Sequence, residues 1–357
     1  MMIEMKERKF SAGSVGMLLV LTLATLLVVF SVAAGLMFGN EVATMMGIER
    51  IGDEDLFTME YKGDYGLDKF LETGASSDTE LVRFIVSNVL HGIPLEFDLP
   101  DLGCSTFAAR LADGTPVFGR NFDMYDSPAL LLTTRPENGY ASISMVNLAY
   151  IGYSADHLPT DLKSSIMALA APYTPLDGVN EKGLAVGVLL IDTEPTNQQT
   201  EKVDITTTSA IRLMLDRAAT VEEAVALLKQ YDMHASAGSC YHFHIADAQG
   251  GSVVVEYIGD KMSVIESDAA TNFLLTPGEY DFGAGQDRCE TLRGALDANG
   301  GVFEDTQQAM ALLAAVKQVP REGKRSTTQW SCIYDQDAAS VEVAMDMNYG
   351  KTYTFSL

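Results

Sequence analysis

The chain has 357 residues, of which 47% are hydrophobic and 20% are charged, and its 24 lysines and arginines stand against 49 aspartates and glutamates, for a formal net charge of -25. This hydrophobic content excludes a mainly disordered protein, and the acidity argues against a nucleic-acid partner, which would need a basic surface. The length suffices for one large domain or two smaller ones with a sizeable core. Composition therefore predicts a globular body of enzyme size.

The N-terminal end differs in charge from the rest of the chain. Lys6, Arg8 and Lys9 outnumber the two glutamates among the first 40 residues, so the acidity lies in the remainder. An uncharged apolar run follows at 15–38. As a helix it is long enough to cross a hydrocarbon core about 30 Å thick. Because the basic residues precede this run and Glu41 follows it, the positive-inside rule predicts a cytoplasmic N-terminus and an extracytoplasmic body.

Small residues at 32–34 also offer a site for signal-peptide cleavage, which would release a secreted body. The run is longer than the apolar core of most signal peptides, which favours an uncleaved signal anchor. We therefore expect residues 1–40 to be a cytoplasmic N-terminus followed by a transmembrane anchor.

Cysteine and histidine positions give no sign of a metal site. The four cysteines (Cys104, Cys240, Cys289 and Cys332) form no CxxC pair and no zinc pattern. His242 and His244 alternate along an apparent strand and share one face, but they have no third ligand nearby. A packed pair is the more common reason for such a pattern, so no metal and no cofactor are expected.

The first predicted helix precedes the main body. Residues 41–65 lack clear periodicity, but Ser77 to Glu80 form a capping box that opens a helix with an apolar stripe. Gly92 and Pro94 end it. Residues 41–103 are therefore predicted to be a small helical unit placed before the body, which spans 104–357.

The body opens with a hairpin signal. Apolar residues alternate at 105–111 and again at 116–122, and Asp113-Gly114 supplies the turn between them. Further strands are predicted at 141–146, 184–191, 241–246, 252–258, 331–334, 341–345 and 353–357, and helices at 205–218, 220–228 and 306–316. Strands grouped at both ends of a helical middle indicate an α+β or layered αββα domain rather than a doubly wound parallel sheet.

The hairpin carries a candidate nucleophile. Its second strand returns to where the first began, so Cys104 is expected beside Arg120 and Asp123. A guanidinium there would favour the thiolate, and a carboxylate would hold an amine, as nucleophilic catalysis by cysteine requires. On these residues alone, a buried cysteine beside a structural Arg–Asp pair is the more common explanation of such a pattern.

The stretch GCSTFAARLADGTPVFGRNFD (103–123) resembles the N-terminal-nucleophile cysteine amidases, a group that includes choloylglycine hydrolases, penicillin V acylases, acid ceramidase and N-acylethanolamine amidase. Further similar pieces lie at 178–184 (GVNEKGL), 221–224, Asp247 with Gly251 and Glu256, 287–288 and 327–331 (TTQWS). The resemblance covers about residues 102–357. It implies a four-layer αββα sandwich, here preceded by a transmembrane helix and a short helical propeptide.

The resemblance also implies roles for individual residues. In this family the cysteine is N-terminal and its α-amino group is the general base. Because Cys104 is internal, the bond between Gly103 and Cys104 must be cut. Residues 41–103 would then be a propeptide, which could stay bound to the body as a noncovalent chain. Arg120 would orient the carbonyl or stabilise the thiolate, and Asp123 would bind the amine. Asn180 and Arg288 would support the site, although Asn180 also suits a structural turn.

The layout indicates a substrate class. Acid ceramidase and N-acylethanolamine amidase carry a helical segment before the cysteine and mature by self-cleavage, as this chain would. We therefore expect a hydrolase of N-acyl amides with fatty tails, such as N-acylethanolamines, acting at the membrane. Conjugated bile salt hydrolase or penicillin V acylase activity is the alternative, and an inactive membrane-tethered lipid-amide binding protein is a second one. The sequence does not separate hydrolysis from acyl transfer.

Two positions depart from the family pattern. The family places an oxyanion-binding asparagine in a Thr-Asn dipeptide, and Pro277 stands where that asparagine is expected, so Asn272 or Thr276 would have to replace it. Leu190 stands about where bile salt hydrolases carry another polar oxyanion residue.

Overall fold

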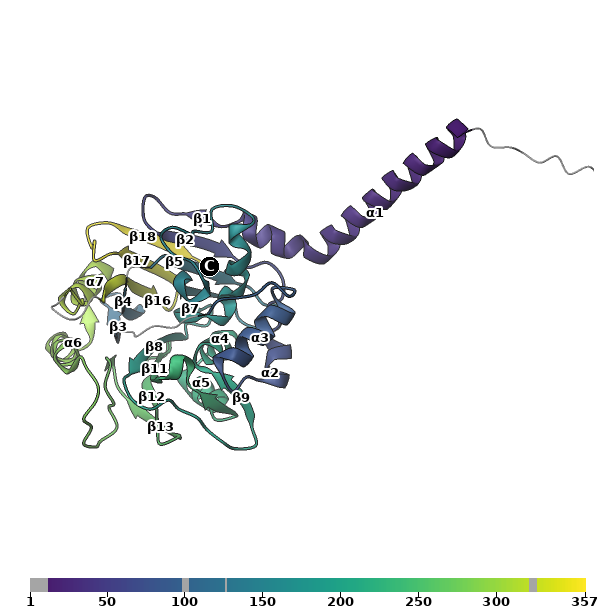
Figure 1. The fold of residues 1–357 in the computed structure, drawn as a ribbon. Coiled ribbons are helices and arrows are strands. Elements are labelled where there is room, and N and C mark those ends of the chain that lie inside the picture. Colours follow the sequence, from purple (N-terminus) through teal and green to yellow (C-terminus); the bar gives the residue numbers. More distant parts are fainter. Residues whose placement is uncertain (1–11, 98–102, 126, 321–325) are drawn as a thin grey trace, which may run out of the picture.

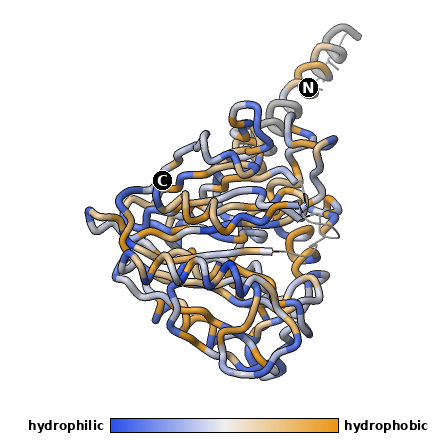
Figure 2. The backbone as a smooth tube through the Cα atoms, turned by 90° about the vertical axis from the view of Figure 1, so that its left-hand side faces the viewer, coloured by the Kyte–Doolittle hydropathy of each residue, from blue (hydrophilic) through white to orange (hydrophobic). Residues whose placement is uncertain are grey.

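The body consists of two stacked β-sheets with helices on both outer faces (Figure 1). The computed structural model describes residues 12–97, 103–125, 127–320 and 326–357. The hydrophobic residues are distributed through both sheets, and the N-terminal helix projects away from them (Figure 2).

One sheet has nine strands. Their order is β1 (Glu49–Arg50), β2 (Leu56–Glu60), β5 (Ala129–Thr134), β6 (Ser142–Asn147), β7 (Pro175–Asn180), β8 (Ala185–Ile191), β11 (Cys240–Ala246), β12 (Ser252–Ile258) and β13 (Lys261–Glu266). All neighbours are antiparallel except β2 and β5. Consecutive strands therefore mostly pair with each other, as hairpins and meanders do.

The other sheet has seven strands. Their order is β14 (Ala269–Ala270), β3 (Gly103–Leu111), β4 (Pro116–Met124), β16 (Thr327–Asp335), β17 (Ser340–Met345) and β18 (Thr352–Ser356), and β15 (Val302–Phe303) also pairs with β3. The last strands of the chain thus lie beside the first hairpin of the body. A separate two-stranded sheet pairs β9 (Val203–Thr206) with β10 (Tyr231–His234).

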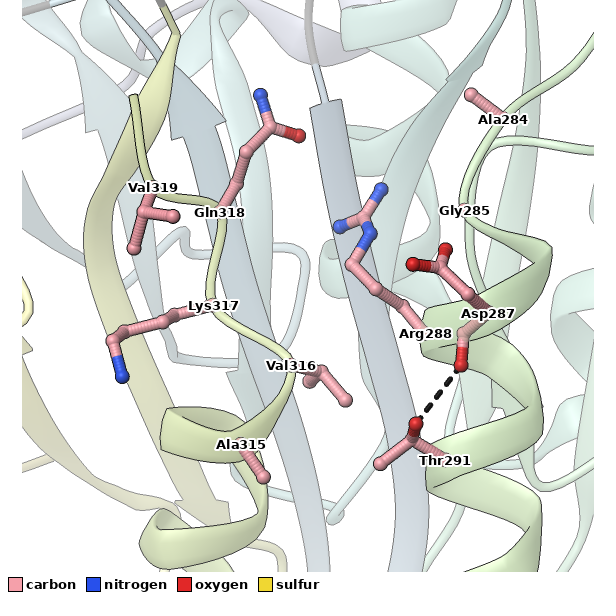
Figure 3. Close-up of a pocket in the computed structure, with 10 residues that line it drawn as sticks. All are labelled: Ala284, Gly285, Asp287, Arg288, Thr291, Ala315, Val316, Lys317, Gln318 and Val319. Atoms are coloured by element: carbon pink, nitrogen blue, oxygen red, sulfur yellow. Dashed lines mark hydrogen bonds between the residues drawn. The ribbon is translucent and has the colours of Figure 1, made fainter. Parts of the chain in front are cut away.

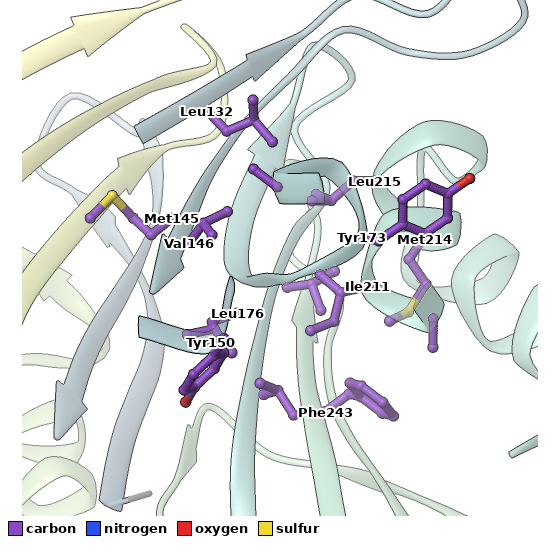
Figure 4. Packing of buried hydrophobic residues seen from close by; sticks show 14 of the residues in the cluster. Leu132, Met145, Val146, Tyr150, Tyr173, Leu176, Ile211, Met214, Leu215 and Phe243 are labelled. Atoms are coloured by element: carbon purple, nitrogen blue, oxygen red, sulfur yellow. The ribbon is translucent and has the colours of Figure 1, made fainter. Parts of the chain in front are cut away.

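The helices cover the outer faces. Helices α4 (Thr207–Arg217) and α5 (Val221–Leu228) pack on the nine-stranded sheet, while α6 (Gln286–Asn299) and α7 (Thr306–Ala315) pack on the seven-stranded sheet. Apolar side chains of α4 and of the strands beneath it belong to one buried cluster (Figure 4). Between the sheets, a Cβ on Gly187 of β8 would lie 3.1 Å from Thr106 of β3, so the two sheets approach closely there. The predicted αββα layering is present.

Several local predictions are confirmed. The β3–β4 hairpin pairs in the expected register around Gly114, which has a φ of +95°. Helix α3 (Asp78–Asn88) begins after Ser77, whose hydroxyl accepts a hydrogen bond from the Glu80 amide. Helix α6 was not predicted, and its glycine N-cap gives no side-chain capping signal.

The segment before the body is not purely helical, which corrects the prediction for 41–103. It contains α2 (Leu67–Thr73) and α3, but also β1 and β2, and β2 pairs in parallel with β5 of the nine-stranded sheet. The alternation at 56–60 is too short to give a strand signal within an irregular stretch. The segment also packs against the 3₁₀ helix η2 (Ser164–Tyr173) of the body, because the rings of Phe70 and Phe84 contact the ring of Tyr173 in η2.

Helix α1 (Ala12–Met46) includes the predicted membrane segment. Among the residues described, no helix is both long and apolar enough to span a membrane. Many side chains of 15–38 lie outside the described residues, as do Lys6, Arg8 and Lys9. The membrane anchor therefore stays a prediction. Short 3₁₀ turns, η1 (Leu148–Ile151) and η3 (Ser236–Gly238), complete the fold.

Candidate active site

Strand register brings the predicted residues together at one end of the seven-stranded sheet. Gly103 pairs with Asp123 across the hairpin, and Cys104 pairs with Phe122. On the other side of β4, Thr328 of β16 lies opposite Asp123. Arg120, which is opposite Thr106, therefore shares a face of the hairpin with Cys104, whereas Asp123 lies on the other face, next to the Gly103–Cys104 bond.

The Cys104 backbone is held at both of its polar atoms. Its N–H donates to Oδ1 of Asn272 at 2.7 Å, and its carbonyl accepts from Nη1 of Arg288 at 3.1 Å. The residue is fully buried. Strand β14 pairs antiparallel with β3, Ala270 opposite Thr106, and this pairing returns Asn272 to the level of Cys104.

Asp123 is a buried carboxylate with strong donors. Nη1 of Arg288 donates to one oxygen at 2.8 Å, and the Thr328 hydroxyl donates to the other at 2.6 Å. Burial raises the pKa of Asp123, and the Arg288 guanidinium opposes that rise. Arg288 comes from the first turn of α6, so this helix supplies a cation that bridges the nucleophile's backbone and the carboxylate.

Arg120 makes a different set of contacts. It is fully buried, and its Nε donates to Oδ2 of Asp177 at 3.3 Å. The Tyr334 hydroxyl donates to the other oxygen of Asp177. Nη1 and Nη2 of Arg120 have no hydrogen-bond partner within the described residues. Buried donors without partners are costly, so this guanidinium is suited to bind an oxygen of a substrate or of a reaction intermediate.

The thiol is protonated in the uncleaved chain. Burial raises the pKa of Cys104 to about 11, although Arg120 and Arg288 act in the opposite direction. A nucleophilic cysteine needs its proton removed. The arrangement therefore provides a nucleophile, cationic donors and a carboxylate, but it still requires a base at the thiol.

Comparison with known proteins identifies this arrangement. Residues 104–276 match the model of the linear amide C-N hydrolases, choloylglycine hydrolase family. This region of the chain is of the linear amide C-N hydrolase type. The match begins at Cys104 itself, so the predicted nucleophile is the first residue of the matched region. A search of curated proteins found no match.

Solved structures support the fold of this hydrolase. A mutant of the conjugated bile acid hydrolase from Clostridium perfringens superposes with a TM-score of 0.54 at 19% identity, covering 71% of this chain and 92% of that one. Penicillin V acylase from Agrobacterium tumefaciens gives 0.50 at 18% identity, covering 71% and 86%. A Caenorhabditis elegans N-acylethanolamine-hydrolyzing acid amidase ortholog gives 0.42 at 16%, covering 71% and 100%. The first two superpositions support the predicted α+β amidase fold of the body.

Asn272, one of the two residues predicted to replace the family's oxyanion-binding asparagine, lies beside Cys104. Its Oδ1 also accepts from Nη2 of Arg288 at 2.9 Å, and its Nδ2 donates to the Leu190 carbonyl at 2.9 Å. Thr271 and Asn272 themselves form a Thr-Asn dipeptide. The expectation that Pro277 occupies the asparagine's position was therefore wrong, because the chain reaches Cys104 five residues earlier.

Thr276 and Asn180 lie elsewhere. The Thr276 amide donates to Glu256 at 3.0 Å, and its buried hydroxyl has no hydrogen-bond partner in the part of the chain that the structure describes. Nδ2 of Asn180 donates to two carbonyls of the α4 end at 2.9 and 2.7 Å, while its Oδ1 accepts from the amides of Lys182 and Leu184. The structure does not bring Asn180 into the group around Cys104. All its hydrogen bonds hold the β7–β8 turn against α4.

Two contributors were missed at sequence level. Asp177 directly precedes the GVNEKGL stretch, and Thr328 belongs to the TTQWS stretch, so both stood within matching pieces without being singled out. Each pairs with a residue of the hairpin more than 50 positions away. Only the resemblance of these two stretches to the family could have pointed to Asp177 and Thr328, because no local sequence pattern marks them.

A polar groove lies beside Arg288 (Figure 3). It has a volume of about 260 Å³ and lies between the start of α6, including Arg288, and the segment after α7. At its inner end, a Cβ on Gly103 would lie 2.9 Å from Oε1 of Gln318 and 3.2 Å from Cβ of Asp123. A side chain at the position before Cys104 would therefore require Gln318 to move and would crowd Asp123. Among the described residues, no group of three His, Cys, Asp or Glu side chains forms a metal site.

Proposed function

We propose that this protein is a membrane-tethered cysteine amidase that hydrolyses N-acyl amides with a fatty acyl chain, such as N-acylethanolamines. The observation that carries the proposal is the convergence of Asn272, Arg288, Asp123 and Arg120 on Cys104, in a chain whose linear amide C-N hydrolase match begins at that cysteine.

Maturation comes first in the proposed mechanism. The Cys104 thiol attacks the Gly103 carbonyl, the peptide C–N bond breaks, and a thioester forms while the Cys104 nitrogen becomes an amine. Water then hydrolyses the thioester, leaving a carboxylate on Gly103 and a free thiol and amine on Cys104. The tight space at Gly103 supports this step, because a side chain there would meet Gln318 and Asp123.

The freed amine then serves as the base. An α-amine titrates near 8, so it accepts a proton from its own thiol at neutral pH. In the uncleaved chain the Cys104 nitrogen already donates to Asn272, and Asp123 lies next to Gly103. These two groups are placed to hold the new amine after cleavage.

Hydrolysis follows the same chemistry on the substrate. The thiolate attacks the amide carbonyl, the tetrahedral oxyanion is stabilised by hydrogen-bond donors, and the amine leaves after accepting a proton. Water then releases the fatty acid from the thioester. The unpartnered Nη atoms of Arg120 are the candidates for contact with substrate oxygen, because they are buried and have no other acceptor within the described residues.

The segment before Cys104 is proposed to stay bound after cleavage. Strand β2 is part of the nine-stranded sheet, and Leu56, Phe57 and Phe70 are at most 1% exposed. Burial of each such side chain contributes about 1.5–3 kcal/mol. The buried Tyr65 hydroxyl also donates to Asp216 of α4. A cut at Gly103 breaks none of these contacts.

The proposed anchor explains the choice of a fatty substrate. An N-acyl amide with a long chain partitions into the bilayer, and a tethered enzyme meets it there at raised local concentration. The extracytoplasmic location and the anchor at 15–38 are part of this proposal.

The test is a substrate panel on the matured protein in detergent micelles. The panel contains N-acylethanolamines, a ceramide, taurine- and glycine-conjugated bile salts and penicillin V, with the Cys104→Ala variant as control. We expect the highest kcat/KM on fatty N-acyl amides and none with the control. A higher kcat/KM on bile salts or penicillin V would overturn the substrate assignment. If the protein hydrolyses none of these amides, the proposed activity is overturned.

A further inference from the structure

A buried histidine and glutamate lie behind Asn272 and have no part in the mechanism above. His242 of β11 and Glu256 of β12 are both fully buried. Nδ1 of His242 lies 3.3 Å from Oε1 of Glu256. Burial of ionisable side chains costs free energy even when they are paired, so packing alone does not explain why His242 and Glu256 lie in the core.

The pair binds both ends of the loop that contains Asn272. Nε2 of His242 lies 2.8 Å from the carbonyl oxygen of Thr271, the residue directly before Asn272. Glu256 accepts from the Leu275 amide at 2.6 Å and from the Thr276 amide at 3.0 Å. The loop from 271 to 276 is thus fixed on each side of its functional residue.

Hydrogen bonding also defines the protonation of the histidine. The Thr271 carbonyl can only accept, so Nε2 of His242 must donate to it. Burial raises the pKa of Glu256, but His242 and the Leu275 amide lower it by more, so the net pKa is below the usual range. An ionised carboxylate also only accepts. Both ring nitrogens of His242 therefore face oxygen acceptors, and each is placed to donate a hydrogen bond.

We propose that His242 and Glu256 are positioning residues for the amidase: they hold the 271–276 loop so that Asn272 faces the nitrogen of Cys104. The inference rests on the proposed function for its kinetic consequence. Asn272 bonds to Cys104, Arg288 and the Leu190 carbonyl at once, so a small shift of its backbone breaks contacts with the nucleophile.

His244 provides a matched control on the same strand. It shares a face with His242 and is equally buried, but its ring bonds to the hydroxyls of Thr106 and Ser252 and to the Ser267 carbonyl. None of these partners belongs to the 271–276 loop. Replacing His244 therefore removes comparable buried hydrogen bonds without releasing Asn272.

The kinetic experiment measures kcat and KM of the full matured protein on an N-acylethanolamine. His242→Leu is expected to lower kcat about 10- to 100-fold with KM changed less than about threefold, because it acts through a positioned group. His242→Gln, whose amide nitrogen reaches the Thr271 carbonyl, is expected to recover most of kcat. His244→Leu is expected to leave kcat within about threefold. In an Asn272→Ala background, His242→Leu is expected to have little further effect on kcat, since the two act on one contact.

Additive losses for His242→Leu and Asn272→Ala, or equal losses for His242→Leu and His244→Leu, would overturn the inference. A second measurement needs neither activity nor a variant. Nitrogen-15 NMR of the wild-type protein at pH 5.5 is expected to show protons on both ring nitrogens of His242 and on one nitrogen of His244. A proton on only one ring nitrogen of His242 would contradict the proposal that His242 donates to both Thr271 and Glu256. If the wild type has no amidase activity, the proposed function fails, whereas this spectrum still decides the inference about the loop.

Discussion

The two sheets contribute different things to the site. The seven-stranded sheet carries the proposed reacting groups Cys104, Arg120 and Asp123 on the β3–β4 hairpin, and Thr328 on β16, which donates to Asp123. The nine-stranded sheet carries residues that support the site: Asp177 on β7 pairs with Arg120, and the Leu190 carbonyl on β8 accepts from Asn272. Reactivity is concentrated in one hairpin, and the opposing sheet holds that hairpin's polar side chains in place.

The largest expected effect comes from the reactive sheet. Cys104→Ala is expected to lower amidase activity by on the order of 10⁴-fold or more, because it removes the nucleophile. Cys240→Ala, a buried cysteine of β11 in the other sheet, is expected to retain near wild-type activity. Hydrolysis rates on one N-acyl amide check both. A comparable loss of amidase activity in the two variants would show that the reacting groups are not confined to the seven-stranded sheet.

The second-largest expected effect comes from Arg120→Lys, which keeps the positive charge of the side chain but changes the geometry of its hydrogen-bond donors. Arg120→Lys keeps a cation beside Asp177 but loses the two Nη donors, because the single ammonium nitrogen of Lys cannot reproduce the planar fork of a guanidinium. The expected loss is about 10²- to 10³-fold in kcat/KM, as for removal of an oxyanion donor. Thermal unfolding of the variant, measured in parallel, should remain close to wild type. Full activity in a folded Lys variant would mean that the Nη atoms contact no substrate oxygen.

A supporting residue should behave differently from a reacting one. Asp177→Asn leaves the buried Arg120 without its counter-ion, and the expected cost is about 3–5 kcal/mol in the free energy of unfolding. The activity of the remaining folded protein is expected to fall only about tenfold, because the donors toward Cys104 persist. Urea unfolding and kcat measured on the same preparation compare the two. A large kcat loss with unchanged stability would reverse the roles assigned to Arg120 and Asp177.

The smallest effect on activity is expected at His244 of the supporting sheet. Burial, followed by the neighbouring His242, lowers the pKa of His244 to about 3, from an ordinary value of 6.5. As pH falls below 6.5, the unfolded chain binds this proton first, so stability is lost between about pH 6.5 and pH 3. His244→Gln is expected to flatten that decline. Urea midpoints from pH 7 to pH 4 measure it, and parallel curves for the two proteins would show that His244 does not titrate in this way.

Sequence reasoning succeeded where the determinants are local. The β3–β4 hairpin placed Cys104, Arg120 and Asp123 because a two-strand turn fixes its own register. The helix after Ser77 was found for the same reason, since its cap lies within four residues. Helix α6 also carries a buried stripe at Cys289, Leu292 and Leu296, a usable signal that was overlooked beside its polar residues.

It failed where contacts join distant segments. Asp177 reaches Arg120 across the gap between the sheets, and no local pattern encodes that pairing. Asn272 depends on β14, a strand of two residues that is too short to be predicted. Strand β2 joins the nine-stranded sheet through a parallel pairing with β5, more than 70 residues later. Local periodicity does not specify such partners.

The most direct test of the account is the intact mass and N-terminal sequence of the purified wild-type protein, beside Cys104→Ala. The account predicts a wild-type chain that begins at Cys104 and copurifies with the segment that ends at Gly103, and a Cys104→Ala chain that stays whole. A wild-type protein that hydrolyses amides with an intact Gly103–Cys104 bond would contradict it.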